Sequence, residues 1–248
     1  MEFIRAAVDA VQRNLPALAL YTVALLLATV GGQAAYWGAL QYLQMDPKTY
    51  WTGPGAILTM VVVSAVFAVP RTAAFAWMGR DIDKPLWRVR DDWDAIKRFY
   101  LLWLMLDLAM SAVWQFTAML YWADNPLALF GKAVSIMLSM LIIPVGGCIM
   151  FSGHMQWRHL PEILAPLTRQ LPKTGILVAA GFIQVWLLSH ISMLVSSPTE
   201  EFPQPFDHFA VTAALMLINS YLDCLIFAGV WLLCMADRDS PDDIDMDF

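Results

Sequence analysis

The chain has 248 residues, of which 59% are hydrophobic and 15% are charged, and its mean hydropathy is +0.58. An ordinary soluble domain has about 25% charged residues, so this composition excludes a soluble domain, a disordered chain and a secreted disulfide scaffold. The formal net charge is −6, and most of it comes from residues 237–248. The chain has no basic tract of the kind that binds nucleic acid. The composition therefore predicts a membrane protein without a nucleic-acid partner.

A short amphipathic segment opens the chain. Its apolar residues fall on one side of a helix and its charged residues on the other; the apolar ones are Phe3, Ile4, Ala7, Val8 and Val11. This pattern is typical of a helix that lies in the membrane interface. The acidic residues in the segment and the long apolar block after it predict no cleaved signal peptide.

Six apolar blocks follow, each close to the ~20 residues that a helix needs to cross a bilayer. They cover residues 16–38, 54–79, 98–120, 127–153, 174–196 and 209–236. The sequence thus predicts an all-α polytopic membrane bundle with six transmembrane helices and an N-terminal interfacial amphipathic helix. Residues 1–236 form its single domain, and residues 237–248 form an acidic cytoplasmic tail. The tail either folds back on basic residues, docks on a basic partner or stays solvated.

The orientation follows from the lysine and arginine residues near the ends of the spans. Arg71 lies within a span, and Lys48 and Lys132 lie at one set of span ends. The others among the 15 lysine and arginine residues flank the opposite ends. Because basic residues are retained on the cytoplasmic side, the N- and C-termini are predicted to be cytoplasmic.

The connection over residues 80–97, with the sequence RDIDKPLWRVRDDWDAIK, is predicted to lie on the membrane surface. It mixes aromatic with basic side chains, namely Trp87, Arg88, Arg90 and Trp93. Two interpretations stay open. The connection is either an anchor on the headgroups of anionic membrane lipids or a docking surface for a cytoplasmic partner.

A second amphipathic stretch precedes the fifth span, with apolar residues at helical spacing: Leu160, Ile163, Leu164 and Leu167. It ends in residues 169–172, RQLP, which resemble residues 13–16, RNLP, before the first span. The ends of the second and sixth spans are also alike, since MGRD at 78–81 resembles ADRD at 236–239. These matches suggest that the two outer helix pairs are a degenerate parallel repeat.

Two charged residues lie at matching depths inside consecutive antiparallel spans. Arg71 precedes Arg80 by nine positions and Asp107 follows Arg98 by nine, which places both ~13 Å deep at ~1.5 Å per residue. A charge at that depth costs several kcal/mol unless it has a partner. The spacing therefore predicts an ion pair between Arg71 and Asp107, either structural or part of a functional gate.

Asp223 lies near the bilayer centre, and no basic residue is expected at its depth. We expect Asp223 either to be protonated or to accept hydrogen bonds from nearby polar groups, the candidates being Tyr221, Asn219, Gln184 and Ser139. Intramembrane acids are expensive and often functional. Asp223, Asn219 and Gln184 therefore form a candidate polar site, which either binds a proton or ligand or joins helices.

The fourth span contains Pro144, Gly146 and Gly147 near its middle, where a kink or a short unwound turn is expected. Such a break exposes carbonyl groups to a ligand in some transporters and is a packing feature in other helices. Small residues recur at four-residue spacing in the first two spans and permit close helix packing; they are Ala24, Ala28, Gly32, Ser64, Ala68 and Thr72.

Metal and catalytic chemistry have little support. Soft and imidazole ligands gather near one membrane face, but without the spacing of a zinc, copper or haem site; they are Cys148, Met150, His154, Met155 and His159. No Walker loop or G-x-S-x-G elbow is present. We expect no cofactor, no metal and no enzymatic activity. The three cysteines fall in or at the ends of spans, so no disulfide framework is expected.

Three features together carry a resemblance: the N-terminal interfacial helix, the Pro144-Gly146-Gly147 break and the stretch ending at residues 169–172. The pattern resembles the uncharacterised bacterial six-helix inner-membrane proteins of the YciC-like type, over nearly the whole chain. The acidic tail and the 80–97 connection depart from it. The resemblance implies a fold and the bacterial cytoplasmic membrane, and it implies no activity.

The pattern also resembles six-span permease subunits of ABC exporters, although the segment 197–207 is short for the re-entrant helices of those permeases. Two functions therefore stay open. The first is a non-enzymatic accessory or scaffold subunit that packs against another membrane protein or complex. The second is a transport component with a cavity that reaches Asp223 or the Pro144 break.

Overall fold

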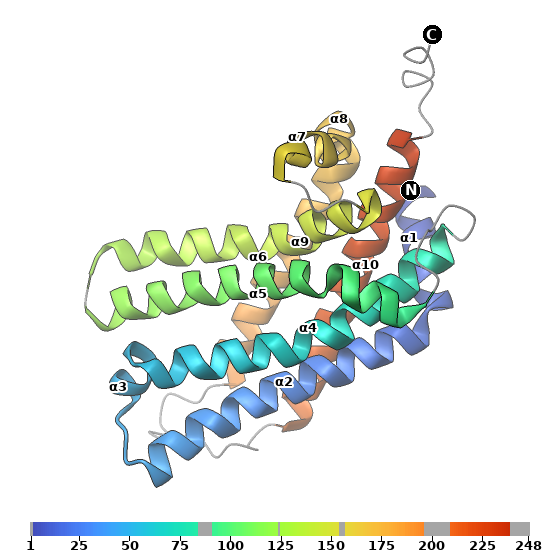
Figure 1. Ribbon diagram of the computed structural model, residues 1–248. Coiled ribbons are helices and arrows are strands. Elements are labelled where there is room, and N and C mark those ends of the chain that lie inside the picture. Colours follow the sequence, from blue (N-terminus) through green and yellow to red (C-terminus); the bar gives the residue numbers. More distant parts are fainter. Residues whose placement is uncertain (1, 84–90, 124, 154–156, 196–208, 239–248) are drawn as a thin grey trace.

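The computed structural model describes residues 2–83, 91–123, 125–153, 157–195 and 209–238. Helices dominate these residues, and no strand occurs among them, as the all-α prediction requires. Six helices are long, and Figure 1 shows them as α2 (Leu15–Tyr42), α4 (Pro54–Ile82), α5 (Asp92–Trp122), α6 (Leu127–Ser152), α9 (Leu171–Val195) and α10 (Phe209–Arg238). The shorter elements are α1 (Glu2–Arg13), α3 (Pro47–Thr52), the 3-10 turn η1 (Trp157–His159), α7 (Leu160–Ile163) and α8 (Ala165–Arg169).

Five of the long helices are long and apolar enough to cross a membrane, namely α2, α4, α5, α6 and α10. Within α9, the segment Leu171–Trp186 is a shorter apolar helix. Apolar runs of this length satisfy all of their backbone hydrogen bonds internally, as hydrocarbon demands. The chain is therefore a multi-pass helical membrane protein.

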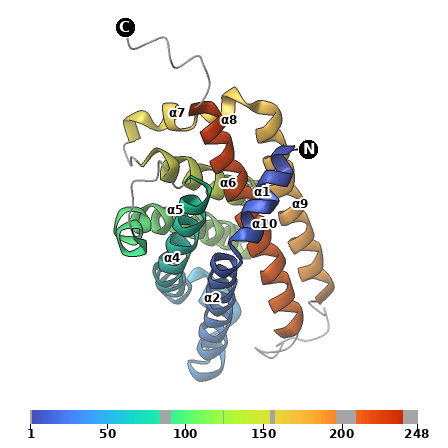
Figure 2. The same cartoon turned by 90° about the vertical axis from the view of Figure 1, so that its right-hand side faces the viewer.

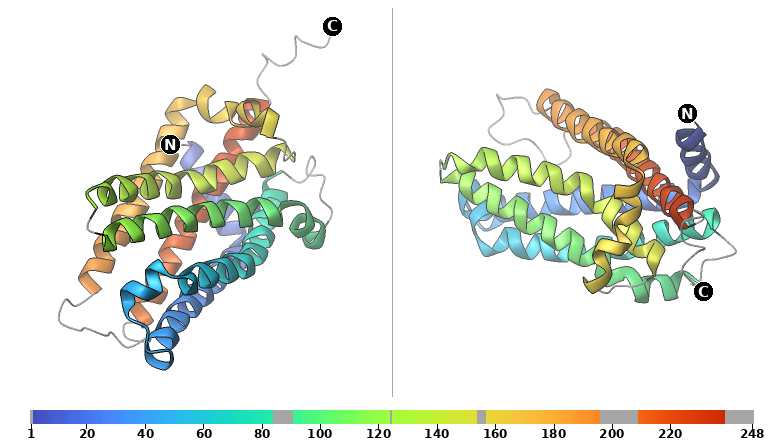
Figure 3. Two further views of the ribbon diagram at one scale, coloured as in Figure 1. Left: turned by 60° about the vertical axis from the view of Figure 1, so that its left-hand side comes forward. Right: turned by 90° about the horizontal axis from the view of Figure 1, so that it is seen from above.

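The helices α2, α4, α5 and α6 lie side by side in chain order, each antiparallel to the next (Figures 1 and 3). Helix α10 packs across this group and contacts α2, α4 and α6, and α9 lies beside α10. The N-terminal helix α1 packs along α10 (Figure 2). The first helix of the chain, α1, is thus in contact with the last one, α10.

The core is concentrated where α10 meets the other helices. Its largest fully buried side chains are mostly aromatic and include Trp103, Trp231, Tyr21, Phe75 and Phe227. The rings of Phe75 and Phe227 stack with centroids 4.4 Å apart. A smaller cluster lies at the opposite end of the bundle and contains Ala39, Tyr50 and Ala56.

Helix α1 packs against the rest of the protein through one face. Its Ala7, Ala10 and Val11 side chains are buried, and the helix packs on α10, while Ile4 is exposed. The small alanine side chains allow the close approach of the two helices. The apolar face predicted from the sequence is therefore used for packing within the protein.

The second amphipathic stretch is broken into short pieces rather than forming one helix. The turn η1 and the helices α7 and α8 follow one another between residues 157 and 169. Pro161 and Pro166 each stand near the start of a short helix, since proline lacks the backbone donor needed further inside a helix. Its predicted apolar residues still pack against the core.

Two boundaries differ from the sequence prediction. Helix α4 continues to Ile82 and α5 begins at Asp92, so the connection is shorter than the predicted 80–97, and residues 84–90 lie outside the described residues. Helix α10 continues to Arg238, two residues into the predicted tail. The rest of the tail lies outside the described residues. In the added turns of α4 and α10, Asp81 and Asp237 form ion pairs with Arg13 and Arg169.

Of the kink and the unwound turn expected in the fourth span, the unwound turn is wrong, because α6 is continuous from Leu127 to Ser152 with Pro144 inside it. Pro144, Gly146 and Gly147 are all buried. A Cβ at Gly146 would lie 2.7 Å from Trp103 Cζ3, so the missing side chain makes room for the indole ring. The indole ring thus packs directly against α6 close to Pro144, where proline removes one backbone hydrogen bond.

Candidate functional site

The two charged residues predicted to pair are in contact. Arg71 on α4 donates a hydrogen bond from Nη1 to Oδ1 of Asp107 on α5. The Arg71 guanidinium carbon lies 4.7 Å from the ring centroid of Phe67 and 5.4 Å from that of Trp103. Aromatic faces attract a cation, and more strongly when it is desolvated. The guanidinium is therefore held by one carboxylate and by aromatic rings in the middle of the bundle.

Tyr21 on α2 extends this contact to Asp223. Arg71 Nη2 donates to the Tyr21 hydroxyl oxygen at 3.1 Å, and the Tyr21 hydroxyl donates to Asp223 Oδ2 at 2.8 Å. Asp223 is therefore not isolated from basic residues, because Arg71 reaches it through one hydroxyl group. Counting residues from helix ends ignores the length of the arginine side chain and a bridging phenol, which together span the gap.

Two amide side chains complete the surroundings of Asp223. Gln184 Nε2 on α9 donates to Asp223 Oδ1 at 2.9 Å and to Asn219 Oδ1 at 2.6 Å. Asn219 Nδ2 donates to Asp223 Oδ2 at 3.4 Å. Within the described residues, the other two predicted donors, Tyr221 and Ser139, form no hydrogen bond to Asp223. The Ser139 hydroxyl instead donates to a carbonyl oxygen of its own helix.

We name these six side chains the polar network: Tyr21, Arg71, Asp107, Gln184, Asn219 and Asp223. They come from five helices, α2, α4, α5, α9 and α10. Trp103 Nε1 on α5 donates to Met150 Sδ on α6 at 3.1 Å and so links the sixth long helix to the same region. A buried charge is tolerable when it is paired and hydrogen-bonded. The polar network therefore joins five of the long helices to one another.

Sequence reasoning missed Tyr21. It is fully buried near the start of an apolar helix, and a buried phenol hydroxyl needs a hydrogen-bond partner. Because few groups within α2 can accept a hydrogen bond from this hydroxyl, its position in an apolar helix was the signal that it contacts a polar group of another helix. The candidates chosen from the sequence, Tyr221, Asn219, Gln184 and Ser139, did not include any residue of the first span.

Ion pairs gather at the end of the bundle that carries both α1 and the last turn of α10. Arg13 pairs with Asp81 at 3.5 Å, and Arg169 pairs with Asp237 at 3.2 Å. In each case an arginine just before one long helix contacts an acid at the end of the next long helix, and both pairs join residues 68 positions apart. This correspondence supports the repeat suggested by the sequence.

The predicted partner or lipid surface is described only in part. Trp87, Arg88 and Arg90 lie outside the described residues. Trp93, at the start of α5, is 62% exposed, and Lys97 Nζ lies 5.6 Å from its ring centroid. Exposed tryptophan and lysine side chains are typical of the boundary between a membrane and water.

Two apolar grooves lie on the outside of the bundle. The larger, which we name the α2/α4 groove, has a volume of about 670 Å³ and is lined by side chains that include Ala24, Ala28, Gly31, Val62, Val66 and Val69. The smaller has a volume of about 310 Å³ and lies between α4 and α5. Neither groove is lined by Asp223 or by Pro144.

No group of three or more potential metal ligands occurs among the described residues. His154 and Met155, considered from the sequence, lie outside that part of the chain. Comparisons of the chain with protein-family models, with curated proteins and with solved structures found no match.

Proposed function

We propose that this protein crosses a membrane six times and acts as a non-enzymatic accessory or scaffold subunit that packs against another membrane protein. The observation that carries the proposal is the polar network. Its charged groups are compensated by side chains of the same chain, in a region packed with aromatic rings. Such a site stabilises an arrangement of helices, and its charges are paired within the chain even though Arg71 Nε and Asp107 Oδ2 have no hydrogen-bond partner among the described residues.

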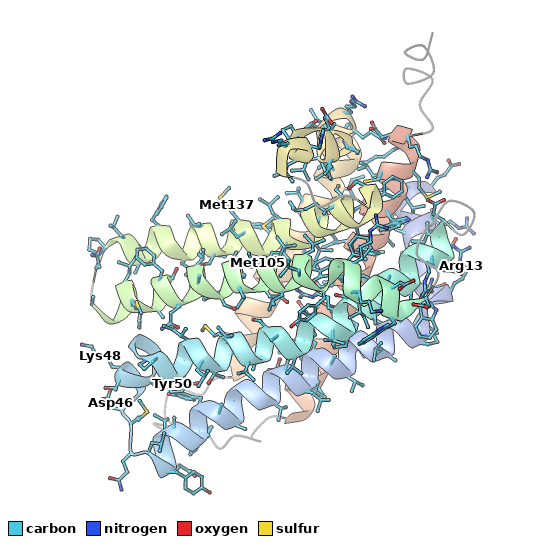
Figure 4. All side chains as sticks on the ribbon, in the orientation of Figure 1. Arg13, Asp46, Lys48, Tyr50, Met105 and Met137 are labelled. Atoms are coloured by element: carbon cyan, nitrogen blue, oxygen red, sulfur yellow. The ribbon has the colours of Figure 1, made fainter. Side chains whose placement is uncertain are left out.

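Six crossings are supported by the length of α9. The helix has 25 residues, which corresponds to about 37 Å at about 1.5 Å per residue and exceeds the ~30 Å of the hydrocarbon core. Arg13 lies at the opposite end of the molecule from Asp46 and Lys48 (Figure 4). With basic residues on the cytoplasmic side, both termini face the cytoplasm. Cysteines introduced at 46 and 13 should then be labelled from opposite sides of the membrane.

The α2/α4 groove is the surface that we propose for the partner. Ala24 and Ala28 lie four residues apart on its wall, and a Cβ at Gly31 would meet no atom within 4 Å. Small residues at such spacing let a second transmembrane helix approach closely. Because the groove is apolar, we propose that its occupant is a helix of the partner protein.

The alternative, a transport component, has less support. It requires a cavity at Asp223 or at Pro144, and neither residue lines the α2/α4 groove or the groove between α4 and α5. Helix α6 is also continuous through Pro144. The resemblance to the YciC-like type stays a prediction and does not distinguish these functions.

The experiment is affinity purification of the full chain from its native membrane in mild detergent, with mass spectrometry of the proteins that accompany it. Gly31→Leu fills the α2/α4 groove, and Gly175→Leu on α9 is the matched control, since both glycines have open space around them. We expect a stoichiometric membrane partner with the wild type and with Gly175→Leu, and its loss with Gly31→Leu. Purification of the wild type alone, or equal recovery with both variants, would refute the proposal.

A further inference from the structure

Two buried cysteines meet where α6 and α10 cross. Cys148 Sγ and Cys234 Sγ are 3.6 Å apart, the two residues are 1% and 2% exposed, and both are free thiols. The helices approach closely here because Gly147 has no side chain. A Cβ at Gly147 would lie 3.1 Å from Val230 Cγ1 on α10.

We propose that Cys148 and Cys234 form a reversible dithiol–disulfide site that staples α6 to α10. A disulfide has an S–S distance of about 2.05 Å, so the two sulfurs must approach by about 1.5 Å. A metal site is disfavoured, since the described residues supply no third ligand.

The oxidant is a small-molecule disulfide, and the reaction is thiol–disulfide exchange. One cysteine, as its thiolate, attacks the small disulfide, which forms a mixed disulfide and releases one thiol. The second cysteine then attacks the protein sulfur of the mixed disulfide and releases the second thiol. The two cysteines lose two electrons and two protons, and the small disulfide becomes two thiols.

The burial of the two thiols and the contact between their sulfur atoms together predict the kinetics of disulfide formation. The first step is slow, because a reagent reaches the thiols only when the helix ends open locally. Both cysteines lie one turn before the end of their helix, where such opening is least costly. The second step is fast because the sulfurs are already in contact. The mixed disulfide therefore does not accumulate in the wild type.

A disulfide between Cys148 and Cys234 would restrain the end of the bundle where several helices meet. Helix α10 contacts α1, α2, α4, α6 and α9, so a covalent link from α6 to α10 restrains the end of the bundle where they meet. On the orientation proposed above, this end faces a compartment that keeps thiols reduced. There the staple would close under oxidising conditions and open again on reduction. Only this last consequence depends on the proposed orientation.

The test uses the purified full chain in mild detergent, treated with the small neutral reagent bis(2-hydroxyethyl) disulfide. We expect the intact mass to fall by two hydrogens, a Cys148–Cys234 peptide in the digest, an apparent Tm higher by several degrees, and full reversal by a phosphine reductant. Cys224→Ser is the matched control. Cys224 is equally buried on α10, and its sulfur contacts no cysteine among the described residues, so this variant should behave as the wild type.

The single variants Cys148→Ser and Cys234→Ser should each stop at the mixed disulfide on the remaining cysteine. Persistence of mixed disulfides in the wild type would overturn the proposal, because the second sulfur would then be out of reach. Disulfides between chains, or disulfides that contain Cys224, would overturn it as well. A crosslinked protein with an unchanged Tm would show that the bond restrains nothing and is no staple.

Discussion

Removal of either partner from the Arg71–Asp107 pair should be costly, and removal of arginine should cost more. Asp107→Leu leaves the guanidinium without its carboxylate, and breaking a buried pair in this way costs about 3–5 kcal/mol of unfolding free energy. Arg71→Met also removes the positive charge that lies near Asp223, to which Arg71 is linked through Tyr21. A buried group that loses its partner costs about 1–3 kcal/mol, so Arg71→Met should exceed Asp107→Leu by about that amount.

The double variant tests whether the two residues are partners. Arg71→Met with Asp107→Leu replaces the pair by apolar side chains, and its cost should fall below the sum of the single variants by about 2–3 kcal/mol. It should remain less stable than the wild type, because Asp223 stays in the bundle without the arginine. Asp223→Asn added to the double variant should restore part of the remaining loss.

The measurement is reversible unfolding of the purified full chain in mild detergent, followed by circular dichroism. The internal control is the pair Arg169–Asp237, whose arginine side chain is 59% exposed. The same cycle there should give a coupling of about 0–1 kcal/mol. Additive costs for Arg71 and Asp107 would refute the pair. A larger cost for Asp107→Leu than for Arg71→Met would refute the link through Tyr21.

Three further outcomes follow from single side chains. Tyr21→Phe should lower the unfolding free energy by about 1–3 kcal/mol, since it removes the hydroxyl between Arg71 and Asp223; a neutral effect in the unfolding assay would contradict the observed hydrogen bonds. Gly146→Ala should cost about 1–3 kcal/mol because its Cβ meets the buried indole of Trp103, whereas Gly31→Ala, which meets nothing within 4 Å, should be nearly neutral. The hydrogen bond from the Thr49 side chain holds the pKa of the exposed Asp46 below its usual value. The stabilisation from this cap is present above the usual pKa and is lost as the pH falls through the lowered one, and carboxyl NMR titration should show the pKa return toward its usual value in Thr49→Val.

The positions of the helices were predictable because a bilayer imposes one rule on each segment by itself. Every backbone donor in hydrocarbon must be satisfied within its own helix, so an apolar run of the right length is enough to predict a span. The contact between Arg71 and Asp107 was predictable for a related reason. Their helices are consecutive and antiparallel, so equal residue counts from the shared end give equal depths.

Contacts between helices distant along the chain were decided by the tertiary structure. Tyr21 and Asp223 are 202 positions apart, and Cys148 and Cys234 are 86 positions apart. Residue counting gives neither contact, because it ignores how α10 crosses its neighbours and how far a side chain reaches. The sequence also could not decide the conformation at Pro144, where the helix is continuous and Trp103 packs against Gly146. Hydropathy and depth are properties of one segment, whereas the mutual packing of α6 and α10 depends on the shapes of both surfaces.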